Sequence, residues 1–121
     1  MARLSMWSLA IAALLAAGVS AQTVHDSKEA GVTLPSVTKE VRPQYTREAL
    51  DAHIEGIVVV SVVVLDDGKV GEVKLTRSLD PTYGLDKQAI AAAKLWEFKP
   101  GTKDGKAAAV RVDLELKFTL K

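Results

Sequence analysis

The chain has 121 residues, with 16 basic residues, 15 acidic residues and no cysteine. This near-neutral balance argues against a nucleic-acid-binding protein, because such proteins concentrate a basic excess on one face. A domain without cysteine forms no disulfide, so its stability has to come from a hydrophobic core.

Residues 1–21 have the pattern of a cleaved secretory signal peptide. Arg3 provides a positive charge, an apolar stretch rich in alanine follows, and Val19-Ser20-Ala21 is typical of a cleavage site. An uncleaved membrane anchor is the alternative, but the apolar stretch from Met6 to Val19 is shorter than the roughly 20 residues that span a bilayer. We therefore expect export and cleavage after Ala21.

Residues 22–40 are expected to form a flexible arm, because they are polar and show no clear hydrophobic period. The folded domain is expected over residues 41–121. It begins with a turn and a short helix after Pro43, and the side chain of Thr46 can cap this helix.

Two strands joined by a hairpin turn come next. The segment from Ile57 to Leu65 is nearly all β-branched, which is typical of a central strand. Asp66 to Lys69 has the composition of a hairpin turn, in which Gly68 is free to adopt a positive φ. Residues 70–78 then form the return strand.

A helix follows and ends near two aromatic residues. Four apolar positions fall on one helical stripe: Leu85, Ala89, Ala92 and Trp96. Pro100 and Gly101 stop the helix and send the chain toward the last strand. Trp96 and Phe98 could form a platform on which a ligand stacks, or they could pin the helix to the sheet. The pin is favoured, because aromatic burial dominates the core energetics of small domains.

Residues 106–121 alternate regularly, which predicts a long strand with one face in the core and the other in water. The apolar positions are Val110, Val112, Leu114, Leu116, Phe118 and Leu120. The other positions carry Arg111, Asp113, Glu115, Lys117 and Thr119. The order helix, strand, strand, helix, strand predicts an α+β fold of two layers, with a three-stranded antiparallel sheet and two helices on one face.

The order and spacing of these residues resemble the TonB C-terminal domain family over about Val41 to Leu120. The shared positions are Pro43, Tyr45, Ala49, Glu55-Gly56, Asp67-Gly68, Val70, Ser78, Leu85-Asp86, Ala89, Trp96, Phe98, Pro100 and Gly105. Structural roles are expected for Gly56, Gly68, Trp96, Phe98 and Pro100.

The resemblance implies a periplasmic binding module that takes part in TonB-dependent transmembrane transport. In the family, the last strand offers a free edge to a short extended segment of an outer-membrane receptor, the TonB box, which binds by strand addition. Here the resemblance implies that residues 107–120 form that edge. The expected partner-binding residues are Arg42, Pro43, Gln44, Tyr45, Val110, Arg111, Val112, Asp113, Leu114, Glu115 and Lys117. Charges on this strand either protect the edge from aggregation, which is favoured, or orient a partner strand.

The sequence departs from the family's energy transducers in three ways. Thr46 follows Tyr45 where the family usually has proline. The stretch from Ala10 to Val19 lacks the histidine of the transducer anchor. Only 21 residues separate Ala21 from Pro43, whereas the transducers carry a long proline-rich spacer. We therefore expect the receptor-binding module without a recognisable coupling to the membrane motor.

No enzyme, cofactor, metal site or small-molecule substrate is expected. His25 and His53 are the only histidines, and zinc sites are built from clustered histidine and cysteine. Asp66-Asp67 suits a turn, and the rest of a calcium loop is missing. Ser61 and Ser78 have no pattern of base and orienting acid near them.

Two other roles stay open. A periplasmic structural or assembly protein could self-associate as a homodimer, through the sheet edge or through Ile57, Val59 and Val63 on the solvent side of the central strand. The other is an inner-membrane-anchored transducer, in which the N-terminal helix is not cleaved and serves as the anchor.

Overall fold

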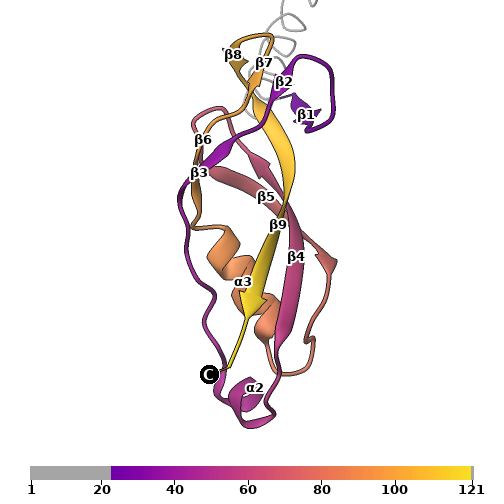
Figure 1. The fold of residues 1–121 in the computed structure, drawn as a ribbon, viewed down its shortest axis with the longest axis vertical. Helices are drawn as coiled ribbons and strands as arrows, with labels where there is room; N and C mark the ends of the chain where they lie inside the picture. Colours follow the sequence, from indigo (N-terminus) through magenta and orange to yellow (C-terminus); the bar gives the residue numbers. More distant parts are fainter. Residues whose placement is uncertain (1–22, 121) are drawn as a thin grey trace, which may run out of the picture.

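The computed structural model describes residues 23–120, and its long strands form a twisted sheet with a helix packed against it (Figure 1). The predicted signal peptide, its cleavage site and the alternative membrane anchor lie outside the described residues. Within residues 23–120, no helix is long and apolar enough to cross a membrane. The elements in chain order are β1 (Val24–Asp26), β2 (Val32–Thr33), β3 (Ser36–Lys39), α2 (Arg47–Asp51), β4 (Gly56–Val64), β5 (Val70–Arg77), α3 (Leu85–Ala93), β6 (Glu97–Lys99), β7 (Thr102–Lys103), β8 (Lys106–Ala107) and β9 (Ala109–Phe118).

The main sheet has the strand order β1-β9-β4-β5. Its central strand β4 is antiparallel to β5 and also to β9, with a register that runs from Gly56 opposite Phe118 to Val64 opposite Val110. The predicted central and return strands are therefore confirmed, as is the α+β class. The last strand, predicted over residues 106–121, is shorter: β9 forms it, and Lys106–Ala107 is the separate strand β8, which pairs with β7.

The layout differs from the prediction of three strands and two helices on one face. A fourth strand, β1, pairs with β9, and two small sheets join β2 to β7 and β8, and β3 to β6. Helix α3 packs on the sheet, but the short α2 lies beyond the end of the sheet (Figure 1) and contributes Ala49 to the core. A helix of five residues has too little apolar surface to cover a sheet face.

Residues 24–39 form three short strands where the sequence predicts a flexible arm. β1 runs parallel to β9, and β2 and β3 run antiparallel to β7 and β6. The chain after α3 is extended on both sides of Pro100-Gly101, so its backbone groups need partners, which the N-terminal segment provides. The polar composition conceals this pairing because the contacts are made by backbone, and every residue of β3 is exposed.

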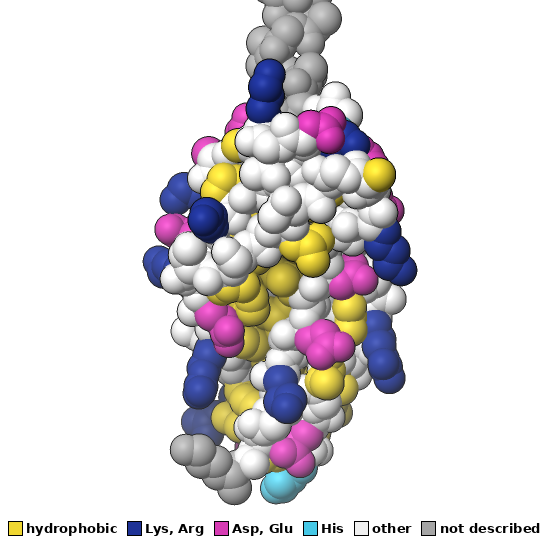
Figure 2. Space-filling view, turned by 45° about the horizontal axis from the view of Figure 1, so that its top comes forward, with side chains coloured by type: hydrophobic (Ala, Val, Ile, Leu, Met, Phe, Trp, Pro, Cys, Tyr) yellow, Lys and Arg dark blue, Asp and Glu magenta, His cyan; other side chains and the backbone are white. Residues whose placement is uncertain are grey.

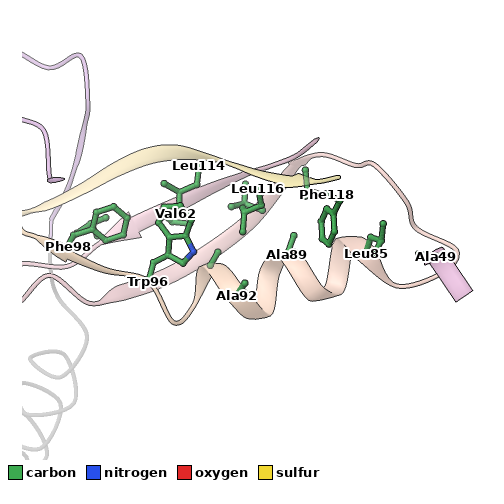
Figure 3. Packing of buried hydrophobic residues seen from close by; sticks show 14 residues of the cluster. Ala49, Val62, Leu85, Ala89, Ala92, Trp96, Phe98, Leu114, Leu116 and Phe118 are labelled. Atoms are coloured by element: carbon green, nitrogen blue, oxygen red, sulfur yellow. The ribbon is translucent and has the colours of Figure 1, made fainter. Parts of the chain in front are cut away.

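The hydrophobic core lies between α3 and the sheet (Figure 3). The alternation predicted for the last strand is confirmed in its second half, because Leu114, Leu116 and Phe118 are buried while the residues between them are exposed. It does not hold at the start of β9, where Ala109 and Val110 are both buried. Trp96 and Phe98 are only 8% and 6% exposed and belong to the same cluster, which confirms that they pin the core. Trp96 lies in the turn after α3, whose last residue is Ala93, and not on the helix itself.

The turn between β4 and β5 packs directly against β6. Gly68 has a φ of 86°, and its carbonyl oxygen accepts a hydrogen bond from the amide of Phe98 at 2.9 Å. A Cβ atom at Gly68 would lie 2.0 Å from the carbonyl oxygen of Phe98. Glycine is therefore required here both for its backbone conformation and for the space it leaves.

Asp80 caps helix α3 from outside the helix. The N-cap residue Gly84 has no side chain that could accept from the first helical amides. The buried carboxylate of Asp80 instead accepts hydrogen bonds from the amides at positions 82, 83 and 85. Negative charge at this end of the helix also suits the helix dipole.

Asp86, in the first turn of α3, joins the helix to the chain that leaves β5. It accepts a hydrogen bond from the Ser78 hydroxyl at 2.5 Å and further bonds from the amides of Leu79 and Asp80. Burial would raise the pKa of this carboxyl, but the three hydrogen bonds outweigh it and hold the pKa below its ordinary value.

Candidate partner-binding edge and groove

Strand β9 has one neighbour over most of its length and a second neighbour over only a small part. β4 pairs with Val110 to Phe118, whereas β1 pairs with Ala109 to Arg111 on the opposite side. On that side, no other strand of the described chain pairs with Val112 to Phe118. This stretch, the free edge, is shorter than the edge expected over residues 107–120.

A groove of about 370 Å³ lies beside the free edge, between β9 and the extended chain that precedes α2. Its lining residues are Glu40, Val41, Arg42, Pro43, Tyr45, Trp96, Glu115, Leu116, Lys117, Phe118 and Thr119. We call it the edge groove. Of its lining, Trp96, Leu116 and Phe118 are buried, and the four charged residues are exposed. Figure 2 shows a face on which hydrophobic side chains form the floor of a hollow and charged side chains stand around it.

Two hydrogen bonds fix the wall of the edge groove that faces β9. The indole Nε1 of Trp96 donates to the carbonyl oxygen of Val41 at 2.9 Å. The hydroxyl of Tyr45 donates to the carbonyl oxygen of Ile54 at 2.7 Å. The Tyr45 ring also meets Phe118 edge to face, with centroids 5.3 Å apart. The wall is therefore held by packed aromatic side chains.

The environment of Tyr45 raises the pKa of its hydroxyl above the ordinary value. Burial raises the pKa of this phenol, and the nearby carboxylate of Glu55 raises the pKa further. The neutral hydroxyl remains a hydrogen-bond donor to the Ile54 carbonyl throughout the physiological pH range.

The structure brings together part of the predicted partner-binding set. Arg42, Pro43 and Tyr45 on one segment and Glu115 and Lys117 on β9 all line the edge groove. These two groups are far apart in sequence and meet only in the folded domain.

The remaining predicted residues lie elsewhere. Gln44 is exposed beside the edge groove but does not line it. Val110 and Leu114 are buried, so they act through their backbone or not at all. Val112 and Asp113 begin the free edge, where Asp113 is exposed.

The side chain of Arg111 is bound on the side of β9 that faces β4 and β5, and not on the side of the free edge. It donates to Ser61 Oγ at 3.2 Å and to Glu72 Oε1 at 2.9 Å, which joins β9 to β5 across β4. The same face was expected to expose Val63, which is only 4% exposed, whereas Ile57 and Val59 are half-buried. The apolar patch proposed for self-association is therefore smaller than expected.

Reasoning from sequence missed several lining residues: Glu40, Val41, Leu116, Phe118 and Thr119. It also favoured a core pin over a ligand platform for Trp96, although this residue both joins the core and lines the edge groove. For two of these residues the sequence did hold a signal. Leu116 and Phe118 alternate with the predicted residues Glu115 and Lys117 on the edge strand and therefore lie beside them.

Possible metal ligands do not gather in this domain. In residues 23–120, no three His, Cys, Asp or Glu side chains come together in a way that could hold a metal ion.

A model of a known protein family matches the same part of the chain as the resemblance seen in the sequence. Residues 41–120 match the family model described as Gram-negative bacterial TonB protein C-terminal. The chain belongs to this family. Its TonB C-terminal domain thus covers about the segment in which the sequence resemblance lies.

Curated TonB proteins are similar to the chain over part of their length. Protein TonB of Vibrio cholerae is 33% identical over 84 residues, which make up 69% of this chain and 34% of the relative. Protein TonB of Xanthomonas campestris is 35% identical over 78 residues, or 64% of this chain and 34% of the relative. The match thus spans about a third of the length of these curated relatives.

A solved TonB domain has the same fold. The solution NMR structure of the Pseudomonas aeruginosa TonB C-terminal domain superimposes with a TM-score of 0.53 at 22% identity. The match covers 84% of this chain and 99% of that structure.

Proposed function

We propose that the chain is an exported TonB-like module that binds an extended segment of an outer-membrane receptor, the TonB box, by strand addition. The observation that carries this proposal is the coincidence of an unpaired stretch of β9 with a groove along it. An edge strand offers its backbone N–H and C=O groups to an incoming strand, and neighbouring pockets take its alternate side chains.

The edge groove supplies both parts of such a site. An incoming strand that pairs with the free edge would place alternate side chains over Trp96 and Phe118, which are buried residues of the groove lining. Its other side chains would face water near Glu115 and Lys117. Backbone pairing would provide most of the affinity, and the apolar floor would provide selection.

Membership of the TonB family supports this role over an enzymatic one. Placement in the periplasm, cleavage of the N-terminal segment and linkage to transmembrane transport are parts of the same proposal. Coupling to an inner-membrane motor is not part of this proposal.

The first test is an NMR titration of labelled residues 22–121 with extended TonB-box-like peptides. We expect backbone amide shifts to concentrate on Val112 to Thr119 and on residues 40–45, with much smaller shifts on β5. The absence of shifts at millimolar peptide would rule out this mode of binding. Shifts confined to the face that carries Arg111 would also contradict it.

A second test separates strand addition from side-chain docking. Two versions of the same peptide carry N-methyl groups on alternate residues, one version on the odd-numbered residues and the other on the even-numbered residues. They keep nearly the same side chains but lose different backbone N–H donors. Strand addition predicts that one phase weakens binding by about tenfold or more, because only every second amide of a strand faces a given neighbour. Equal affinity for the two phases would contradict the proposal.

A third test acts on the protein. Asp113→Pro removes an N–H group at the start of the free edge and should weaken binding if this group faces the partner. Unchanged peptide binding by a folded Asp113→Pro protein would count against pairing at this position. Asp113→Ala is the matched control, because it removes the same side chain and keeps the N–H group.

A further inference from the structure

The chain itself already occupies one end of the edge that a partner would use. β1 lies parallel to β9 in the main sheet, with Val24 opposite Ala109, His25 opposite Val110 and Asp26 opposite Arg111. β1 therefore adds a strand to the edge of β9 over three positions, in the way that is proposed for a partner strand. Two small cavities mark this junction, one of them lined by Asp26, Ser27 and Lys28 of the N-terminal segment and by residues 111–113 of β9.

β1 is weakly held in comparison with the other neighbour of β9. Its register with β9 covers three positions, whereas that of β4 covers nine. Val24 is 42% exposed and Asp26 is also exposed, so β1 buries little apolar surface. Segments with few buried contacts belong to the least stable parts of a fold and open locally without global unfolding.

The contacts that hold the loop after β1 are also mostly exposed. His25 Nδ1 lies 2.9 Å from Glu29 Oε2, and Lys103 Nζ lies 2.9 Å from the same oxygen. The side chain of Glu29 is 39% exposed, and contacts to a carboxylate this accessible to solvent contribute little to stability. They guide the loop but do not lock β1 onto β9.

A firm anchor begins immediately after this loop. Gly31 has a φ of 81°, and its carbonyl oxygen accepts a hydrogen bond from the amide of Asp104 at 2.9 Å. β2 then pairs with β7 at Val32 and Thr33. β1 can therefore leave β9 while the chain from Gly31 onward stays in place.

We infer that β1 is a displaceable internal cap on the partner-binding edge. While β1 is bound, a partner strand can pair only with Val112 to Phe118; when β1 leaves, the edge lengthens by the three positions from Ala109 to Arg111. Long extended partners thus compete with the chain's own N-terminal strand, and short partners do not. The inference rests on the proposed function, because it concerns regulation of the same edge.

Two variants of the exported chain, residues 22–121, place the cap in opposite states. Val24→Cys with Ala109→Cys joins directly opposed positions in a chain that has no other cysteine, so oxidation locks the cap and reduction releases it. The triple variant V24P/H25P/D26P removes every N–H donor of β1 and so frees the edge. The matched control is V24A/H25A/D26A, which changes the same side chains but keeps the donors.

The probes are two synthetic peptides with alternating valine and threonine. The short one has about six residues, enough to pair with the free edge. The long one carries about three further residues at each end, so that it reaches Ala109 in either strand direction. We expect the short peptide to bind all proteins with similar affinity. The long peptide should bind the triple-proline protein about five- to tenfold more tightly than the oxidised double-cysteine protein, because only the freed edge offers the three further positions from Ala109 to Arg111 for backbone pairing.

The outcomes separate the two proposals. Short-peptide binding with equal long-peptide affinity for the locked and freed proteins would overturn the cap and leave strand addition intact. Failure of both peptides to bind any protein would overturn the proposed function and the cap with it. Hydrogen exchange adds a readout that needs no peptide: amides of β1 should exchange much faster than those of β4, and equal protection would contradict a displaceable cap.

Discussion

Trp96 and Val41 are joined by a hydrogen bond of 2.9 Å from the indole Nε1 to the backbone carbonyl oxygen. This bond links the turn after α3 to the extended chain that forms one wall of the edge groove. The indole ring at the same time belongs to the hydrophobic core. One side chain thus connects the stability of the domain to the shape of its candidate binding site.

Trp96→Phe should lower stability and loosen the groove wall. The phenyl ring keeps part of the core packing but leaves the Val41 carbonyl without its donor, which costs about 1–2 kcal/mol. In a domain of this size, that loss lowers Tm by roughly 4–8 °C per kcal/mol, measurable by thermal unfolding. Leu95→Ala is the control, because Leu95 is exposed and its loss should cost less than about 0.5 kcal/mol. Equal effects of the two changes would show that the indole N–H contributes nothing.

Gly68→Ala and Gly105→Ala separate a backbone cost from a steric cost. Both glycines have positive φ, at 86° and 83°. A Cβ at Gly68 would meet the Phe98 carbonyl oxygen at 2.0 Å, whereas a Cβ at Gly105 would meet no atom within 4 Å. Gly105→Ala should therefore cost about 1–2 kcal/mol for conformation alone, and Gly68→Ala should cost clearly more by urea unfolding. Similar losses at the two sites would mean that β6 moves aside without penalty.

The sequence was informative where side chains determine the structure. The β-branched run of β4, the glycine turn after it and the alternation of β9 each predict one local structure, and burial in the core then confirms them. The aromatic pair at Trp96 and Phe98 was correctly expected in the core, because a small domain has few other large apolar side chains to bury.

The parts that depend on backbone pairing could not be predicted in this way. β1, β2 and β3 come from polar sequence, and their partners in β9, β7 and β6 lie 58 or more residues later, the shortest separation being that of Lys39 and Glu97. Arg111 shows the same limit at the site, because alternation gives its face but not its choice of Ser61 and Glu72 as partners. The position of Val41 in the groove wall depends on the hydrogen bond from Trp96 to its backbone carbonyl, which no side-chain pattern in the sequence indicates.

The side chain of Thr46 caps helix α2 and links it to the segment before α3. Its hydroxyl oxygen accepts from the amide of Ala49 at 3.1 Å and donates to the carbonyl oxygen of Tyr83 at 2.7 Å. Thr46→Val should therefore cost about 1–2 kcal/mol, because it removes the cap of α2 and the link to the segment before α3. Thr46→Ser keeps the hydroxyl and should retain most of the stability in the same unfolding assay. A fully stable Thr46→Val protein would show that α2 needs no cap.

Asp86 should make part of the domain's stability depend on acid pH. Its folded pKa lies below the ordinary value, so its stabilising effect is fully present above about pH 4–5 and is lost as the pH falls through the folded pKa. Asp86→Asn should cost about 1–2 kcal/mol at neutral pH, because a charged acceptor of three hydrogen bonds becomes a neutral amide.

Urea unfolding from pH 7 to pH 2.5 measures this dependence. The stability difference between wild type and Asp86→Asn should shrink as the pH falls, because only the wild type loses the carboxylate. Glu29 and Glu72 also have lowered pKa values, through Lys103 and His25 in one case and through Arg111 in the other. They are present in both proteins and therefore cancel in the difference. Asp51→Asn, at an exposed position of α2, controls for the loss of one negative charge. A difference that stays constant across this range would show that the ionised form of Asp86 carries no part of the stability.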